Sequence, residues 1–362
     1  YYISNKFAKS KESEIYKAWA WGNYKYQSKS KKILLYVKEQ KELEFLTFYS
    51  DCINLSRDLI NSPANKLNPS TYYSKIKNNN LFKSFNFIDY TEKEINSNFP
   101  LTCAVGKSSS SKPKVIEITN RKLSKKDKPL VIIGKGVTFD TGGVNIKPGT
   151  SMRNMKKDMG GSAIAISLFL LANYFLKKTK IVLIAPIAEN AISSKSMRPG
   201  DVYSSVSGKS VEIAHTDAEG RLLLADAIEK ASSYNPCMII DFATLTGAAR
   251  VALGEDLPAY FCNNETFAKK IENLNKEKLR CWRLPLYSPY LVKIKSQLAD
   301  LSNASLDGMA GSITAALFLQ EFLKSPNIPW FHFDTFAWSQ DSKGAALQGL
   351  DIMSDFLRKN FN

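Results

Sequence analysis

The sequence predicts an α/β protein with a mixed, largely parallel central sheet that is covered by helices on both faces. Short runs rich in β-branched residues recur along the chain, and stretches with the helical spacing of apolar residues lie between them. The runs are apolar at nearly every position, which is typical of strands buried on both faces of a sheet. Strands that alternate with helices in this way favour a parallel sheet.

The elements follow in order along the chain. A long helix is predicted over residues 41–60, and the Pro and Asn residues of NSPANKLNP end it. Six runs predict strands: KVIEIT (114–119), PLVIIGKG (129–136), KIVLIAPI (180–187), VEIAHTD (211–217), CMIIDFATLTG (237–247) and WFHFDTFAW (330–338). Three further helices are predicted over 162–177, 222–234 and 313–324. In such a fold, functional residues gather where strands end and loops begin.

Composition narrows the class of protein. The 362 residues carry 50 Lys and Arg against 34 Asp and Glu, a net charge of +16. This charge fits either a solvated Lys-rich surface or a nucleic-acid-binding patch. We favour the first, because the basic residues are mostly Lys in strings such as 28–32 and 121–128, and no recognised nucleic-acid motif occurs.

Neither a membrane span nor a disulfide framework is predicted. The longest apolar stretch, Ala163 to Leu176, is broken by Asn173 and is too short to cross a bilayer, so it indicates a buried helix. The five cysteines are widely spaced, and no pair has CxxC spacing. This usage indicates a reducing, cytoplasmic setting.

Charged residues cluster where the predicted strands end. Lys135, Asp140 and Lys147 lie in a Gly-rich loop that follows the strand 129–136. Asp158 comes just before the buried helix 162–177, and the stretch HTDAEGRL supplies the remaining acidic and basic groups. These are Asp217, Glu219 and Arg221. The period-two spacing of these three places them on one side of the chain if strand geometry continues through them.

Converging carboxylates must be neutralised, either by protonation or by cations. Like charges about 4 Å apart repel by roughly 4 kcal/mol per pair at an effective dielectric constant near 20. Divalent metals are the natural partners of several oxygen ligands. The chain has only two histidines, His215 and His332, and no HExxH motif, so a His-rich zinc site is excluded. A carboxylate-dominated pair of metals, able to activate water, remains.

Each of these residues also has a structural interpretation. Asp217 could cap the helix that starts near Ala218, with Glu219 favouring the helix dipole. Asp158 could cap the helix that begins near Gly160. Lys135 and Lys147 could be ordinary surface lysines.

The segments GKGVTFDTGGVNIKP, MKKDMGG and TDAEGRL closely resemble the signature segments of the leucine aminopeptidase (cytosol aminopeptidase) family, whose members hold two metals. The segments RDLINSPANKLNP, DFATLTGAARVALG, ADLSNAS and AGSITAALFLQEF are similar as well. The resemblance runs from about Ser50 to the C-terminus, and TDAEGRL is highly specific.

The resemblance implies a metal-dependent aminopeptidase that removes N-terminal amino acids from peptides. The metals would be two Mn or Zn ions, with a hydroxide that bridges them as nucleophile and Asp140 and Glu219 shared between them. Lys147 would polarise the scissile carbonyl, and Arg221 would hold a bicarbonate ion. The implied metal ligands are Lys135, Asp140, Asp158, Asp217 and Glu219, and the implied first-residue site comprises Met155, Thr244, Leu245 and Gly247.

The resemblance also implies domains and partners. Residues 41–362 would form the catalytic domain, and 1–40 a remnant of an N-terminal domain or linker. The expected partners are peptides with a free N-terminus and five further copies of the chain in a homohexamer, without a membrane. The alternative function is a basic nucleic-acid-binding relative with secondary or lost peptidase activity, which we consider less favoured.

Two local departures from the family pattern stand out. His215 occupies a position where the family usually has Asn, and we expect it to form a hydrogen bond beside the metal site rather than to bind metal. Phe336 and Trp338 stand where many relatives carry small residues, so a preference for Leu at the first position is not implied.

Overall fold

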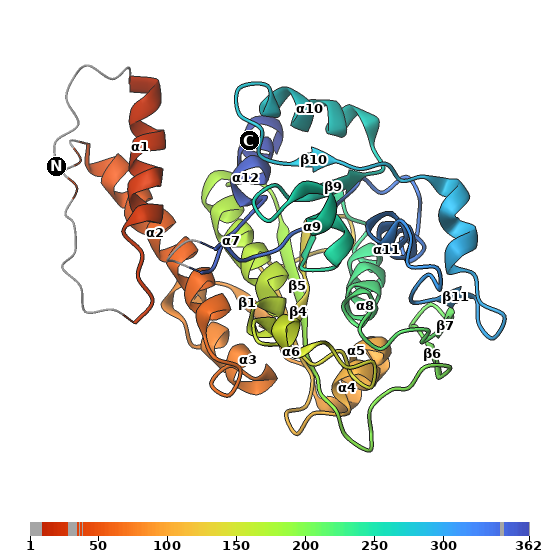
Figure 1. Ribbon diagram of the computed structural model, residues 1–362. Helices are drawn as coiled ribbons and strands as arrows, with labels where there is room; N and C mark the ends of the chain where they lie inside the picture. The colour runs from red at the N-terminus through yellow and green to blue at the C-terminus, as the bar shows by residue number, and fades with distance from the viewer. Residues whose placement is uncertain (1–8, 28–34, 36, 38, 341–343, 362) are drawn as a thin grey trace.

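The computed structural model describes residues 9–27, 35, 37, 39–340 and 344–361 (Figure 1). Among these residues, a nine-stranded sheet has the order β1-β2-β5-β3-β8-β12-β9-β10, with β4 paired to β5. Its strands are β1 (Asn86–Ile88), β2 (Lys114–Thr119), β3 (Leu130–Gly134), β4 (Gly136–Asp140), β5 (Ile181–Asn190), β8 (Met238–Ala243), β9 (Ala259–Cys262), β10 (Trp282–Arg283) and β12 (Trp330–Asp334).

The sheet is mixed and largely parallel, as predicted. The central strands β4, β5, β3, β8 and β12 run parallel to one another, whereas β1 pairs antiparallel with β2, β2 with β5 and β9 with β12. A second, three-stranded sheet joins β6 (Val202–Ser204), β7 (Ser210–Glu212) and β11 (Leu301–Ser302). Because the central strands are parallel, their carboxyl ends meet at one edge of the sheet.

Helices cover both faces of the large sheet (Figure 1). Alternate strand residues point to opposite sides, so Ile132 and Ile240 join one hydrophobic cluster and Val131 and Ile239 the other. The first cluster includes residues of α2 (Gln40–Asn61), α3 (Pro69–Lys77), α7 (Gly160–Phe175), α10 (Glu265–Asn275) and α12 (Leu350–Phe361), and the second includes residues of α4 (Glu92–Asn98), α5 (Pro100–Gly106), α8 (Gly220–Ser233) and α11 (Gly311–Gln320). The short segments α6 (Gly149–Met152), α9 (Gly247–Leu253), η1 (Asn80–Phe82), η2 (Met155–Met159) and η3 (Ser288–Ile294) complete the helical elements outside the N-terminal region.

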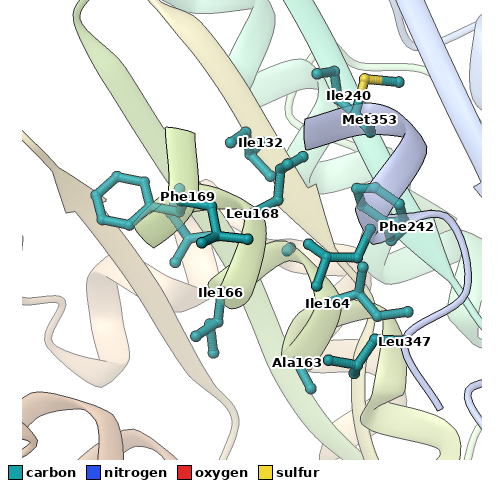
Figure 2. Packing of buried hydrophobic residues seen from close by; sticks show 14 of the residues in the cluster. Ile132, Ala163, Ile164, Ile166, Leu168, Phe169, Ile240, Phe242, Leu347 and Met353 are labelled. Atoms are coloured by element: carbon teal, nitrogen blue, oxygen red, sulfur yellow. The ribbon is translucent and has the colours of Figure 1, made fainter. Parts of the chain in front are cut away.

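Helix α7 lies at the centre of the first cluster. Figure 2 shows Ile164 and Leu168 of this helix among Ile132 and Ile240 of the sheet and Met353 of α12. The segment 155–175, which joins η2 to α7, is long and apolar enough by length and composition to cross a membrane, but 83% of its most apolar window is buried inside the protein. It is the core helix that the sequence predicts.

The helices and most strands predicted from sequence are confirmed within a few residues. The run 211–217 is the exception, because its strand β7 ends at Glu212 and a turn follows. The Gly-rich loop after β3 also contains a strand that the sequence did not predict, β4, and Asp140 is its last residue.

Helix α1 (Lys9–Gly22) lies beside α2 (Figure 1). The Trp21 indole donates a hydrogen bond to the Tyr49 hydroxyl over 2.8 Å, and the Tyr24 hydroxyl donates to Asp58 Oδ1 over 2.8 Å. The predicted boundary between residues 40 and 41 stays a prediction, and positions 1–8, 28–34, 36 and 38 of the N-terminal part lie outside the described residues.

Candidate metal centre

The candidate site lies at the carboxyl edge of the parallel strands. Lys135 follows β3, Asp140 ends β4, Asn190 ends β5 and Thr244 follows β8. The charged residues that follow the apolar runs in sequence therefore lie at the edge of the sheet where functional residues are expected. Asp158 reaches the same region from η2, and Glu219 from the start of α8, as their contacts with Lys135 show.

Three carboxylates converge. Asp140, Asp217 and Glu219 each offer an oxygen, and these atoms all lie within 4.8 Å of one another. Asp140 and Glu219 are almost fully buried, whereas the Asp217 side chain is 27% exposed. No histidine belongs to this group in the part of the chain that the structure describes. Oxygen atoms at this spacing suit hard divalent cations.

Two lysines lie among the carboxylates. Lys135 Nζ lies 2.8 Å from Asp158 Oδ2 and 3.1 Å from Glu219 Oε1. Lys147 Nζ lies 2.9 Å from Asp140 Oδ2 and 2.5 Å from Asp217 Oδ1. The Lys135 side chain is 3% exposed and that of Lys147 15%, so the surface-lysine interpretation is wrong for both.

The electrostatics of the cluster call for added positive charge. Burial and the neighbouring charge of Asp140 raise the pKa values of both Asp217 and Glu219. Burial alone would lower the pKa of Lys135, but Asp158, Glu219 and Asp140 together raise it. Both Glu219 oxygens are buried and lack a hydrogen bond of good geometry within the described residues, although Oε1 lies near the Lys135 ammonium. A carboxylate left in this state fits a cation ligand.

The sequence predicted that Asp217, Glu219 and Arg221 lie on one side of an extended strand. This is wrong, because the chain is not extended there. Residues 213–219 form a turn, Glu219 has helical dihedral angles and Arg221 lies inside α8. The side chain of Asn303 holds this turn, since Oδ1 accepts from the amides of Ala214 and His215 and Nδ2 donates to the carbonyls of His215 and Ala218. The two carboxylates converge through this turn instead.

The capping interpretations are also wrong. The residue before α8 is Glu219, whose side chain makes no capping hydrogen bond, and the residue before α7 is Met159. Asp158 instead accepts a hydrogen bond from the Thr244 hydroxyl at 2.7 Å and pairs with Lys135. The acidic residues therefore serve the cluster rather than the helix ends.

Glycines allow the close approach at this site. A Cβ atom at Gly220 would lie 2.4 Å from Cε of Lys135, so only glycine lets this lysine pass the start of α8. Gly142 has φ +86° and donates its amide to Asp140 Oδ1 at 2.8 Å. These contacts explain two of the glycines that flank the acidic residues.

Three polar residues that position the site had no role in the sequence analysis. Asn190 donates to Asp140 Oδ1 at 2.8 Å, and Asn303 holds the 213–219 turn. Asp334 accepts from the amides of Leu245 and Thr246, which connect β8 to α9. Asn303 and Asp334 lie in segments that were quoted for their pattern, but their partners are distant in sequence.

Arg221 and His215 border the cluster. Arg221 is buried, and its Nε and Nη1 atoms have no hydrogen-bond partner among the described residues. Burial lowers its pKa to about 10, partly opposed by Glu219 and Asp334. His215 is exposed, and its Nδ1 accepts from the Asp217 amide at 3.2 Å, a contact to the backbone of an acidic residue of the cluster.

The residues expected at the first-residue site lie on two segments. Met155 begins η2, three residues before Asp158, and Thr244, Leu245 and Gly247 form the connection from β8 into α9. The Thr244 carbonyl accepts from Lys135 Nζ at 2.9 Å, which joins this connection to the acidic cluster.

Fold and site together define an α/β protein with an acidic centre suited to divalent cations. A sequence model of the catalytic domain of the cytosol aminopeptidase family matches residues 54–353. The chain belongs to the cytosol aminopeptidase family, which confirms the resemblance to leucine aminopeptidases.

Relatives and solved structures agree with this assignment. Probable cytosol aminopeptidases from Syntrophotalea carbinolica and Chlamydia caviae are 38% and 41% identical over 298 and 288 residues. These alignments cover 82% and 78% of this chain but 59% and 57% of the relatives, so the chain spans less than two-thirds of their length.

The crystal structure of the cytosol aminopeptidase from Coxiella burnetii matches with a TM-score of 0.87 and 38% identity, over 97% of this chain and 79% of that chain. The bottromycin maturation enzyme BotP, in complex with Mn, matches with a TM-score of 0.86 and 28% identity over the same shares.

Proposed function

We propose that this chain is a metal-dependent aminopeptidase that hydrolyses the N-terminal peptide bond of peptides. The observation that carries the proposal is the convergence of Asp140, Asp217 and Glu219 within 4.8 Å, with Lys135 and Lys147 between the carboxylates. Membership of the family supplies the reaction type. Residues 41–362 would form the catalytic domain, most of which the family match covers.

Five residues would hold two divalent ions, Mn or Zn. Glu219 fits this role because both of its oxygens are buried without a hydrogen bond in the described structure, and Asp140 because its Oδ2 faces the cluster. Lys135 would have to be neutral as a ligand, which adjacent cations favour. When bound, the metals would polarise a carbonyl and activate a water molecule. The proposed ligands are Lys135, Asp140, Asp158, Asp217 and Glu219.

Lys147 and Arg221 would act on the substrate side of the site. Burial opposes the charged form of Lys147, but Asp140, Glu219, Asp158 and Asp217 together raise its pKa, which favours an ammonium here. It can therefore stabilise negative charge that develops on the carbonyl oxygen. The unpartnered Nε and Nη1 atoms of buried Arg221 fit a small anion such as bicarbonate, which would move a proton from the attacking water.

The substrates would be peptides with a free N-terminus, with the first residue beside Met155, Thr244, Leu245 and Gly247. We predict that unblocked dipeptides release free amino acid in the presence of Mn²⁺ or Zn²⁺, that chelator stops the release, and that N-acetylated dipeptides are not cleaved. The reason is that the acetyl group removes the basic amine that would anchor the chain end. Amino acid analysis of the products measures this outcome. Cleavage of the acetylated substrate, or activity that survives complete metal removal, would contradict the proposal.

The chain would work as a homohexamer in the cytoplasm. The names of the matched relatives and the five unpaired cysteines support this location. Support for self-association comes from apolar side chains on α9, η3 and the loop before α11. Val251, Val292, Leu306 and Met309 are between 66% and 92% exposed.

We expect light scattering to give a hexamer mass for the wild type and a smaller assembly for a Val251→Asp, Leu306→Asp double variant, since buried charges weaken an apolar interface. A monomeric wild type would contradict the assembly, and a hexamer that survives both changes would place the interface elsewhere.

A further inference from the structure

Phe336 lies at the same edge of the sheet as the metal centre. It follows β12, two residues after Asp334, whose carboxylate accepts from the amides of the β8–α9 connection. Phe336, Thr246 and Asp334 line the same small pocket. The ring therefore stands beside the segment proposed to contact the first residue of the substrate.

Two cations lie over the Phe336 ring. Lys157 Nζ is 4.5 Å from the ring centroid, and the guanidinium carbon of Arg250 is 4.9 Å from it. Lys157 comes from η2, directly before Asp158, whereas Arg250 comes from α9. Segments on both sides of the proposed first-residue site thus each place a positive charge at one aromatic side chain.

Lys157 lacks an anion. The residue is 4% exposed, and its ammonium makes no hydrogen bond or ion pair with any residue that the structure describes. The nearest acidic neighbour in sequence, Asp158, already accepts from Thr244 and pairs with Lys135. Its other charged neighbours, Lys135, Lys147 and Arg250, are all positive. An ammonium on a side chain with so little exposed surface is costly unless an anion joins it.

Arg250, unlike Lys157, is an exposed residue. It forms no ion pair within 4.0 Å among the described residues, although Glu255 lines the same cavity. The carboxylate of Asp334 is occupied by Thr246 and Ser312 in addition to the two backbone amides. No described carboxylate therefore forms an ion pair with either member of the Lys157–Arg250 pair.

We propose that this pair binds the side-chain carboxylate of an acidic first residue, so that the enzyme prefers peptides beginning with Glu or Asp. The inference rests on the proposed aminopeptidase function and names its substrate class. Phe336 fills space beside the site and holds both cations on its ring. The carboxylate could come from the side chain of the first residue or from the C-terminus of a short peptide. The side chain is the better source, because Lys157 is adjacent to the proposed metal ligand Asp158, where the first residue would bind.

The test measures how the Mn²⁺-loaded full chain cleaves four amino acid p-nitroanilides: glutamyl, aspartyl, glutaminyl and leucyl. These substrates carry no C-terminal carboxylate. We expect kcat/KM for the glutamyl and aspartyl substrates to exceed those for the glutaminyl and leucyl substrates by about 10-fold or more. Leucyl or glutaminyl cleavage that equals or exceeds glutamyl cleavage would overturn the preference and leave the aminopeptidase function standing. A preference for acidic first residues seen only with dipeptides that end in a free carboxylate would also overturn the proposal. Cleavage of none of the four substrates would overturn both the preference and the aminopeptidase function.

Variants identify the residues. Lys157→Met and Arg250→Gln should each lower the glutamyl-to-leucyl ratio of kcat/KM by about 10-fold or more, and Arg250→Gln serves if Lys157→Met does not fold. Lys156→Met is the matched control, because Lys156 donates to the Asn61 carbonyl and packs on Trp338 instead. Calorimetry should show that free glutamate binds more tightly than free leucine, and that Arg250→Gln removes this difference. An unchanged ratio in the Arg250 variant would contradict the assignment.

Discussion

Glu219→Gln is expected to lower kcat/KM for release of the N-terminal residue on the order of 10³-fold. The Glu219 carboxylate is buried between Lys135 and Asp140, and its oxygens have no hydrogen bond in the described structure that the amide could preserve. The amide cannot supply the negative charge that the two proposed cations would require. Steady-state kinetics with saturating Mn²⁺ measure the effect.

The fold of the Glu219→Gln variant should survive. Burial and Asp140 raise the pKa of Glu219, so its ionised form is disfavoured in the folded protein, and a neutral side chain relieves that repulsion. We expect the melting temperature of the metal-free variant to be no lower than that of the metal-free wild type. Glu265→Gln, an exposed change at a residue paired with Arg283, is the control and should keep full activity. Wild-type activity in Glu219→Gln would remove this residue from the site.

Lys147→Met is expected to lower kcat by roughly 10²–10³-fold while the metal content stays unchanged. Lys147 keeps its charge in the cluster, and its Nζ lies beside Asp140 and Asp217. Loss of the ammonium would therefore remove the proposed stabilisation of charge on the carbonyl oxygen without removing a proposed metal ligand. Kinetics combined with elemental analysis separate these two effects.

The matched control for Lys147 is Lys195→Met, at an exposed lysine. The control should behave as the wild type. If Lys147→Met lost metal in proportion to activity, Lys147 would act through the metal ligands. If it lost neither, it would lie outside the catalytic machinery.

The sequence was sufficient for the architecture because the signals were local and strong. The apolar runs of β2, β3, β5, β8 and β12 predict buried strands at nearly the observed positions, and the run at 162–177 predicts the core helix. The order of strands and helices then places Lys135, Asp140 and Thr244 at the carboxyl edge of the sheet. Their convergence follows from parallel strand geometry.

The local geometry at Glu219 could not be predicted in this way. Alternating charges in HTDAEGRL suggested an extended segment, but the chain turns there because the side chain of Asn303 binds both sides of the turn from 88 residues away. Asn190 likewise positions Asp140 across 50 residues. Such side chain to backbone and side chain to side chain contacts depend on tertiary packing and leave no periodic pattern in the sequence.

The arrangement around Phe336 was only partly foreseen. The sequence indicated that a bulky residue alters the first-residue site, and the structure places Lys157 and Arg250 on its ring. MKKDMGG contains two adjacent lysines, and nothing in their order says that Lys157 is buried while Lys156 reaches the Asn61 carbonyl. That difference arises from the direction of each side chain on η2.

The most direct measurement is an anomalous difference map from crystals of this protein grown with Mn²⁺. We expect two manganese peaks among Lys135, Asp140, Asp158, Asp217 and Glu219, with Asp140 and Glu219 contacting both ions. A map with no peak at these side chains, or with manganese bound only elsewhere on the surface, would contradict it.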